Sequence, residues 1–123
     1  MMEIPELRVT PDRYLTYRYA GASGDFNPIH IDDDFAQQVG LPGKILHGLW
    51  TMAQVARALT ESGGGPHALR ALEVQFRGVG LPEREITVTG TVQEAGDGMA
   101  VVHMVAEQDG KAIIRNAEAE LVL

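Results

Sequence analysis

Cysteine is absent from the 123-residue sequence. Its absence excludes disulfide bonds, thiolate metal ligands and cysteine nucleophiles together, and it is compatible with a reducing compartment. Basic residues are scarce too, because ten Lys and Arg face seventeen Asp and Glu and leave a formal net charge of -7. A chain of this charge repels a phosphate backbone, so we expect no nucleic-acid partner.

Long apolar runs are also missing. No stretch approaches the roughly 20 apolar residues that cross a bilayer, and residues 1–6 lack the basic and apolar regions of a secretory leader. We therefore expect a cytoplasmic protein without a membrane partner. The length and the 45% hydrophobic content suit one globular domain over residues 1–123.

The first third of the chain is rich in residues that break regular structure. The sequence predicts a short helix over 12–22 and then a rigid loop, because Pro28 lacks a backbone N–H and pushes Asn27 towards an extended conformation. The three aspartates at 32–34 are expected to cap a second, brief helix that runs through Val39.

The most apolar segment of the chain runs from residue 45 to 59. Its apolar residues cover most of a helix circumference, so we expect a helix there that is buried on nearly all sides. The glycines at 63–65 and Pro66 are expected to end it, since a glycine run is a poor helix and proline cannot continue one.

Beyond Pro66 apolar and polar residues alternate, which is typical of strands. The apolar positions of the first two predicted strands are Leu72, Val74, Phe76, Ile86, Val88 and Val92. Two more strands are predicted over about 99–108 and 111–123, joined by Asp109-Gly110, a strong hairpin signal.

A buried helix followed by four strands in meander order indicates an α+β fold. The strands would form an antiparallel sheet that curls around the helix and buries it. This is the hot-dog arrangement. Such a sheet leaves long edges exposed, so we expect two copies of the chain to pair as a homodimer.

The densest group of reactive side chains lies within residues 23–30. Asp25 and His30 stand on either side of the turn at Pro28. An imidazole can take a proton from water near neutral pH, and a carboxyl group can exchange one with a neighbouring carbon or oxygen. An alternative stays open: Asp25 and Asn27 can serve only the turn amides, with His30 an incidental loop residue.

The segment from Tyr19 to His30 reads Y-A-G-A-S-G-D-F-N-P-I-H and is followed by His47-Gly48. It resembles the signature of the MaoC-like, (R)-specific enoyl-CoA hydratases and dehydratases, closely over about 15–59 and more loosely beyond. The resemblance implies that Asp25 and His30 act together on a water molecule and that Asn27 shapes the site. It also implies an acyl thioester substrate, which carries coenzyme A or phosphopantetheine, and no metal or redox cofactor.

The start of the central helix offers a further candidate. Residues 44–48 contain no Ser, Thr, Asp or Asn to cap the first amides, which therefore need another partner. Gly48 lets a ligand approach closely, and the positive helix end favours negative charge on a thioester oxygen. Helix packing is the alternative for Gly48, and the resemblance favours the oxyanion role. His47 is expected to be a satisfied structural histidine.

Other positions bear on the pocket. Ala53 stands where some bacterial members of the family have serine, a departure that concerns the pocket and leaves the pair of Asp25 and His30 intact. Trp50, Met52 and Phe76 can line an acyl tunnel, but apolar residues at such spacings are more often ordinary core. Candidates for the substrate phosphates, most of them expected to be solvated surface charges, are Lys44, Arg57, Arg70, Arg77 and Arg84.

The residues and the resemblance together predict reversible hydration of a trans-2-enoyl thioester to a (3R)-3-hydroxyacyl thioester. A less favoured alternative is an iron site, because His30 and Asp32 with His47 or His103 can imitate a two-histidine, one-carboxylate set. In another, the chain is the catalytic or stabilising subunit of an unlike pair of hot-dog proteins, or a thioester-binding protein without activity of its own. Thioesterases share the fold, but fold alone does not fix chemistry.

Overall fold

The protein is described by a computed structural model that covers residues 3–62 and 64–123. The N-terminal segment that is expected to lack a leader includes Met1 and Met2, and the predicted helix stop includes Gly63. These three residues lie outside the described residues. The elements in chain order are β1 (Leu7–Val9), α1 (Leu15–Ser23), the 3-10 helix η1 (Pro28–His30), α2 (Asp33–Gln38), α3 (Gly48–Ser62), the 3-10 helix η2 (Pro66–Ala68), β2 (Leu69–Phe76), β3 (Ile86–Gly96), β4 (Met99–Gln108) and β5 (Lys111–Val122).

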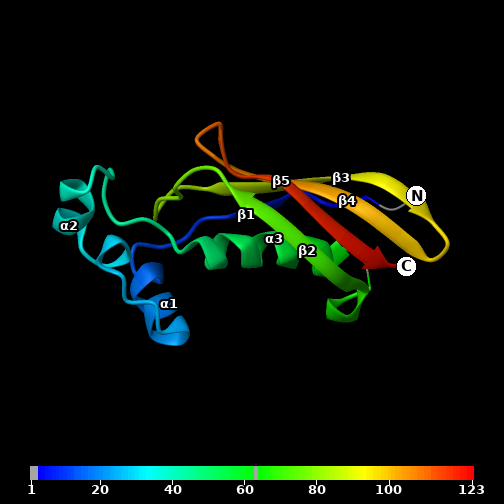
Figure 1. The fold of residues 1–123 in the computed structure, drawn as a ribbon, viewed down its shortest axis with the longest axis horizontal. Coiled ribbons are helices and arrows are strands. Elements are labelled where there is room, and N and C mark those ends of the chain that lie inside the picture. The colour runs from blue at the N-terminus through cyan, green and yellow to red at the C-terminus, as the bar shows by residue number, and fades with distance from the viewer. Residues whose placement is uncertain (1–2, 63) are drawn as a thin grey trace.

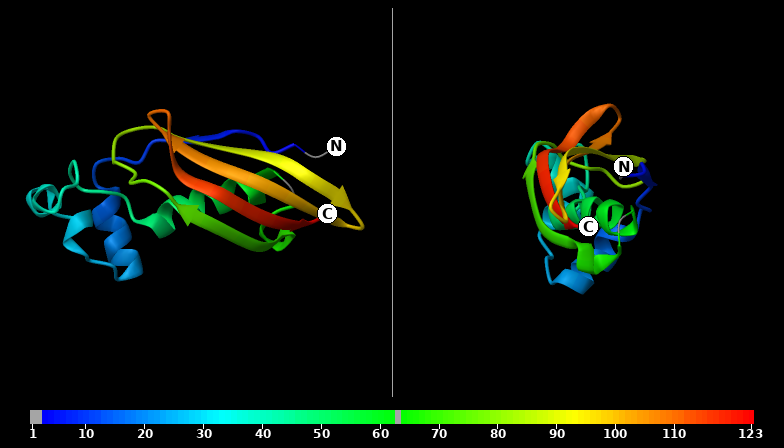
Figure 2. Two further views of the ribbon diagram at one scale, coloured as in Figure 1. Left: turned by 45° about the horizontal axis from the view of Figure 1, so that its top comes forward. Right: turned by 90° about the vertical axis from the view of Figure 1, so that its right-hand side faces the viewer.

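One antiparallel sheet lies against α3 along the long axis of the molecule (Figure 1). The sheet curves around one side of the helix, as the end-on view in Figure 2 shows, and α1 and α2 lie beyond the N-terminal end of α3. This confirms the predicted hot-dog arrangement. No helix in the described part of the chain is long and apolar enough to span a bilayer.

The strand order is β1-β3-β4-β5-β2, so the predicted meander of four strands is wrong at its first step. Strands β3, β4 and β5 follow one another, but β2 pairs with β5 at the far edge. The connection over 77–85 is long enough to cross the end of the sheet, whereas a meander would need a short hairpin turn. The three-residue β1, which pairs with β3, was not predicted.

Two tight turns join β3, β4 and β5. In the predicted hairpin Asp109 and Gly110 have φ angles of 53° and 75°, the positive pair that a two-residue type I′ turn requires. Asp97 and Gly98 repeat the dipeptide between β3 and β4 with φ angles of 54° and 75°. The same sequence signal therefore fixes both hairpins.

Helix α3 begins at Gly48, three residues later than predicted. The amide of Ile45 donates to the carbonyl of Ile29 (3.0 Å) and that of Leu46 to the carbonyl of Gly80 (2.8 Å). These bonds to neighbouring segments hold 45–47 in a non-helical conformation. The expected burial on nearly all sides is also wrong, because the sheet covers one side only and leaves Leu49 64% exposed.

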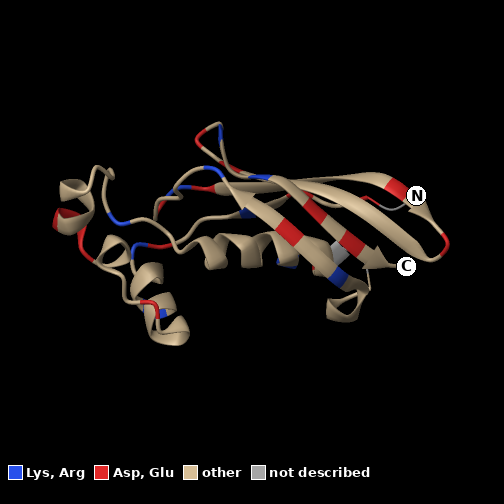
Figure 3. Cartoon of the chain, in the orientation of Figure 1, with Lys and Arg blue, Asp and Glu red and all other residues tan. Residues whose placement is uncertain are grey.

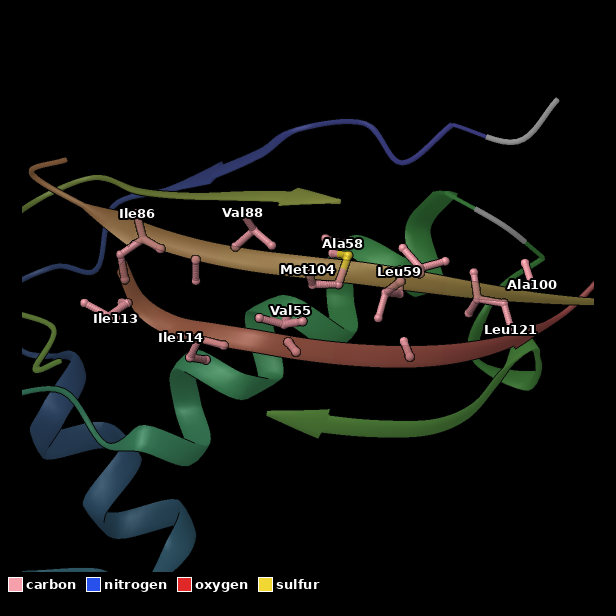
Figure 4. Packing of buried hydrophobic residues seen from close by; sticks show 14 of the residues in the cluster. Val55, Ala58, Leu59, Ile86, Val88, Ala100, Met104, Ile113, Ile114 and Leu121 are labelled. Atoms are coloured by element: carbon pink, nitrogen blue, oxygen red, sulfur yellow. The ribbon is translucent and has the colours of Figure 1, made fainter. Parts of the chain in front are cut away.

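The buried face of α3 forms the core with the inner face of the sheet. Val55 and Leu59 are fully buried and pack in one cluster with Val88, Met104 and Ile114 from three neighbouring strands (Figure 4). Burial of side chains of this size contributes about 1.5–3 kcal/mol each. The core therefore fixes α3, and with it the position of its N-terminal end.

Gln108 holds the connection over 77–85 in place. Gln108 is 5% exposed. Its Oε1 accepts from the Leu81 amide (2.8 Å), and its Nε2 donates to the carbonyls of Leu81 (2.8 Å) and Arg84 (3.0 Å). We expect Gln108→Leu to lower the free energy of unfolding by about 2–3 kcal/mol, because it leaves buried backbone groups without partners. Urea unfolding measures this. Gln93→Leu, at an exposed position of β3, should change the free energy of unfolding little. Equal effects of Gln108→Leu and Gln93→Leu would contradict the prediction.

Candidate active site

The loop after α1 is built by side chains that bond backbone amides. Gly24 ends α1 with a φ of 78°, and its amide donates to the carbonyl of Ala20 (2.8 Å). Asp25 Oδ1 accepts from the Asn27 amide (3.2 Å), and Asn27 Oδ1 accepts from the Ile29 amide (3.2 Å). The open alternative is thus partly realised, since Asp25 and Asn27 do serve turn amides. The second oxygen of Asp25 remains available.

His30 ends η1 as a buried side chain. Its Nδ1 lies 2.8 Å from the carbonyl oxygen of Ile45. A carbonyl oxygen can only accept, so Nδ1 carries the proton of the neutral ring and Nε2 keeps its lone pair. This assigned tautomer makes Nε2 the proton acceptor of the ring.

The free oxygen of Asp25 and the free nitrogen of His30 face each other. Asp25 Oδ2 lies 3.7 Å from His30 Nε2, too far for a direct hydrogen bond but close enough for one water oxygen to contact both atoms. The His30 side chain is 9% exposed and that of Asp25 is 53% exposed. The pair is therefore sheltered on the imidazole side and open to solvent on the carboxylate side.

The segment over 44–47 carries the other half of the site. The backbone amide of Lys44 (2.8 Å) and its Nζ (3.2 Å) both donate to Asp33, and these bonds lower the pKa of Asp33. The contacts of Lys44 with Asp33 and the hydrogen bond from the Ile45 amide to the Ile29 carbonyl tie this segment to the loop that holds His30. The second half of the site is thereby fixed against the first.

His47 lies against both members of the pair. It is 3% exposed. Its ring stacks on that of His30 with centroids 3.8 Å apart and an interplanar angle of 19°, and its Nε2 lies 3.0 Å from the backbone carbonyl oxygen of Asp25. The ring of Tyr19 adds a tilted contact at 4.8 Å. The sequence led us to expect a structural histidine at position 47 and did not predict these contacts. The one signal for them was the place of His47 beside Gly48 in the family-like motif.

Asp25, His30 and His47 each offer a metal-ligating atom, all within 4.8 Å of one another. An imidazole binds a metal in its own plane, and two nearly parallel rings at 3.8 Å do not direct their lone pairs to one point. The group found among the described residues contains neither Asp32 nor His103. Asp32 caps α2 by accepting from the Phe35 amide (3.1 Å), so the geometry does not fit the iron alternative.

Gly48 opens α3 next to the pair. The amides of Trp50 and Thr51 donate to the carbonyl of His47 (3.1 and 3.3 Å), but those of Gly48 and Leu49 have no acceptor within residues 3–62 and 64–123. A Cβ at Gly48 would lie 3.1 Å from the ring of Phe76. Close packing and a free amide therefore coexist at Gly48, which is exposed.

The structure brings only some of the basic candidates together. Arg77 and Arg84 line a cavity of about 600 Å³ at the 77–85 connection, and they are joined there by Lys111 and Arg115 of β5. Figure 3 shows basic positions near this connection and acidic ones along β2 and β5. The two β5 residues were missed because nothing in the sequence relates them to residues more than 25 positions earlier.

The remaining basic candidates do not line this cavity. Lys44 pairs with Asp33, and Arg57 pairs with Glu61 at 2.7 Å on α3. Arg70 lies on β2 and does not line the cavity. Two of the five basic candidates thus line this cavity, and Lys44 lines a neighbouring one together with Arg84.

Comparison with known proteins extends the likeness over most of the chain. Fatty acid synthase subunit beta of Aspergillus oryzae is 36% identical over 108 residues, which cover 83% of this chain and 5% of that protein. Enoyl-CoA hydratase ChsH3 of Mycobacterium tuberculosis is 29% identical over 120 residues, 93% of this chain and 40% of that protein. The chain therefore spans less than half the length of these relatives.

Solved structures share the fold. The ChsH1-ChsH2 complex from Mycobacterium tuberculosis aligns with a TM-score of 0.88 and 22% identity, over 100% of this chain and 98% of that one. The (R)-hydratase from A. caviae involved in PHA biosynthesis aligns with a TM-score of 0.87 and 20% identity, over 97% of this chain and 92% of that one.

The family model described as a MaoC like domain matches residues 3–112. The matched stretch holds the loop with Asp25 and His30, the start of α3 with Gly48, and four of the five strands. The motif, the fold and the match agree over the same residues, and the chain therefore belongs to the MaoC-like dehydratase family.

Proposed function

We propose that the chain catalyses reversible hydration of trans-2-enoyl thioesters to (3R)-3-hydroxyacyl thioesters. The observation that carries the proposal is the 3.7 Å gap between Asp25 Oδ2 and His30 Nε2, together with the amide of Gly48, for which the described part of the chain offers no acceptor. Membership of a family of hydratases and dehydratases that act on acyl thioesters supports the same reaction class.

In the proposed reaction the water lies between Asp25 and His30. Nε2 of His30 takes a proton as the water oxygen bonds to C3, and the electron pair of the double bond moves towards the thioester carbonyl oxygen. The Gly48 amide donates to that oxygen as its negative charge grows. The proton taken from the water passes from His30 through the Asp25 carboxyl to C2, so the substrate gains one water and both side chains return to their starting protonation. Addition is syn because both groups act from one side.

The direct test is turnover of crotonyl-CoA by the purified chain. Hydration removes the conjugated double bond, so enoyl absorbance should fall and the product should have the (3R) configuration. A (3S) product, or no turnover by the purified chain in any assembly state, would overturn the proposal. Enoyl-CoA substrates of graded length and with ring-bearing acyl groups then define the acyl preference.

The basic cavity leads us to expect that the chain binds the phosphates of coenzyme A there. The 77–85 connection, which supplies much of the cavity lining, is bonded to the segment over 44–47, because the amide of Leu46 donates to the carbonyl of Gly80 (2.8 Å). Arg84 is already paired with Asp109 (2.7 Å), which leaves Arg77, Lys111 and Arg115 as the main candidates. The guanidinium group of Arg77 donates to the neutral side chain of Gln75, and that contact does not neutralise its charge.

We expect the double variant Arg77→Ala, Arg115→Ala to raise KM for crotonyl-CoA about 10-fold with little change in kcat, since exposed charge contacts contribute up to about 1 kcal/mol each. KM for the crotonyl thioester of N-acetylcysteamine, which has no phosphate, should stay unchanged. Arg8→Ala on β1 is the matched control. An equal KM increase for both thioesters would contradict a phosphate contact.

We also propose that two copies pair. The outer edge of β2 has no partner strand within the described chain, and Leu49 (64%) and Phe76 (50%) expose apolar surface nearby. Sedimentation should then give twice the mass of the chain. A monomer that becomes active only with a second hot-dog protein would instead favour the unlike pair, an arrangement that the name of the ChsH1-ChsH2 complex gives for that structure.

A further inference from the structure

His47 contacts both proposed catalytic residues, the side chain of His30 and the backbone of Asp25, through different parts of one ring. Its face lies on the imidazole of His30, with centroids 3.8 Å apart. Its Nε2 meets the backbone carbonyl oxygen of Asp25 at 3.0 Å. It is a link between two residues that have no direct hydrogen bond of their own, since their functional atoms are 3.7 Å apart.

We propose that His47 is a positioning residue that sets the gap between Asp25 and His30. The proposal rests on the function proposed above and gives His47 a role that requires no direct contact with the water or the acyl group. Stacking fixes the plane of the His30 ring, and the hydrogen bond fixes the backbone that carries the Asp25 carboxylate. Loss of either contact changes the place at which a water can touch both atoms.

The two contacts depend on different features of the His47 side chain, its N–H donor and its flat ring. The carbonyl oxygen of Asp25 can only accept, so Nε2 of His47 carries the proton and donates it. The stack needs a flat ring and no particular polar atom. His47→Gln therefore keeps an N–H donor without the ring, and His47→Phe keeps a ring without the donor.

The surroundings of His47 hold the ring where both contacts form. It is nearly fully buried, with the Tyr19 ring at 4.8 Å on α1. Its backbone carbonyl accepts from the amides of Trp50 and Thr51 (3.1 and 3.3 Å), which ties it to the first turn of α3. The position of the pair thus follows from the position of α3, which the core fixes.

A residue that only fills space predicts a different outcome from one that positions the pair. In the first case the activity of variants falls only as far as the folded fraction falls. In the second, folded variants lose kcat while KM hardly changes, because a positioning residue acts on the pair and does not bind the acyl thioester. A misplacement of about 1 Å at reacting groups can cost about 100-fold in rate.

The experiment compares His47→Ala, His47→Gln and His47→Phe with the exposed control His103→Ala on β4. Thermal unfolding gives the folded fraction, and crotonyl-CoA hydration gives kcat and KM. We expect a fall in kcat of about 100-fold for His47→Ala, about 10-fold for each of the two partial variants, and KM within about 3-fold throughout. If His47→Ala does not fold, the partial variants carry the test.

NMR of the His30 ring gives a readout that does not depend on turnover. Its carbon-bound protons should shift when His47→Gln removes the stacked ring and should shift much less in His47→Phe. Wild-type kcat in folded His47→Gln and His47→Phe, or unshifted His30 protons in His47→Gln, would overturn the positioning role while hydration by the wild type stands. An inactive wild type with the expected shifts would instead overturn the proposed function and leave the contact intact.

Discussion

Asp25→Asn is expected to lower kcat for enoyl-thioester hydration by about 1,000-fold while the loop around it stays folded. General acid–base groups contribute about 100- to 10,000-fold to rate, and an amide at this position cannot take and return the proton that reaches C2. The new side chain keeps an oxygen that can accept from the Asn27 amide, as Asp25 Oδ1 does at 3.2 Å. The measurement is the loss of crotonyl-CoA absorbance together with thermal unfolding.

The control for this variant is Asp32→Asn. Asp32 also accepts a backbone amide through its carboxylate, from Phe35 at 3.1 Å, but it lies outside the group formed by Asp25, His30 and His47. Its kcat should stay within about 2-fold of wild type, far below the effect of a lost acid–base group. If both variants lost activity equally, or neither did, the role of Asp25 would be one of loop structure alone.

His30→Gln is expected to lower kcat by a similar factor of about 1,000. The glutamine amide can still donate to the carbonyl of Ile45, which His30 Nδ1 meets at 2.8 Å, but it offers no basic nitrogen to the water. The stability of the fold should therefore fall less than the activity. Hydration assays and urea unfolding measure the two effects on the same samples.

The pair of variants also tests whether the two groups act as one unit. Residues that act on the same water are not independent, so the double variant Asp25→Asn, His30→Gln should be little slower than either single variant. Multiplication of the two losses would show that each residue acts in a separate step. His103→Gln, on an exposed histidine of β4 that pairs with Glu118 at 3.4 Å, should keep wild-type kcat.

Local signals in the sequence predicted much of the fold. The Asp32 cap, the Asp109-Gly110 hairpin and the alternation over the strands all depend on residues within a few positions of one another, and the structure confirms each. The start of α3 did not follow the apolar pattern. Residues 45–47 give their amides to distant partners at Ile29 and Gly80, which no local pattern reports.

The order of the strands depended on a contact far along the chain. Gln108 at the end of β4 bonds Leu81 and Arg84 and so fixes the connection that takes the chain from β2 to β3. In sequence Gln108 is an ordinary polar residue at a strand end. Its burial, and with it the departure from a meander, becomes visible only once the sheet is assembled.

The candidate site divides in the same way. The motif placed Asp25, Asn27 and His30 on one rigid loop, and the structure brings the side chains of Asp25 and His30 to face each other. The stacking of His47 on His30 could not be predicted, because it depends on the hydrogen bonds that Ile45 and Leu46 make to the distant residues Ile29 and Gly80. The catalytic roles themselves remain predictions for the assays above.

The most direct measurement of the central claim is the geometry of addition. Hydration of crotonyl-CoA in D2O places one deuterium at C2, and NMR of the product reports its orientation relative to the C3 hydroxyl. A carboxylate and an imidazole that contact the same water predict syn addition with the (3R) alcohol. Anti addition would require proton and hydroxyl to arrive from opposite faces and would contradict the shared water between Asp25 and His30.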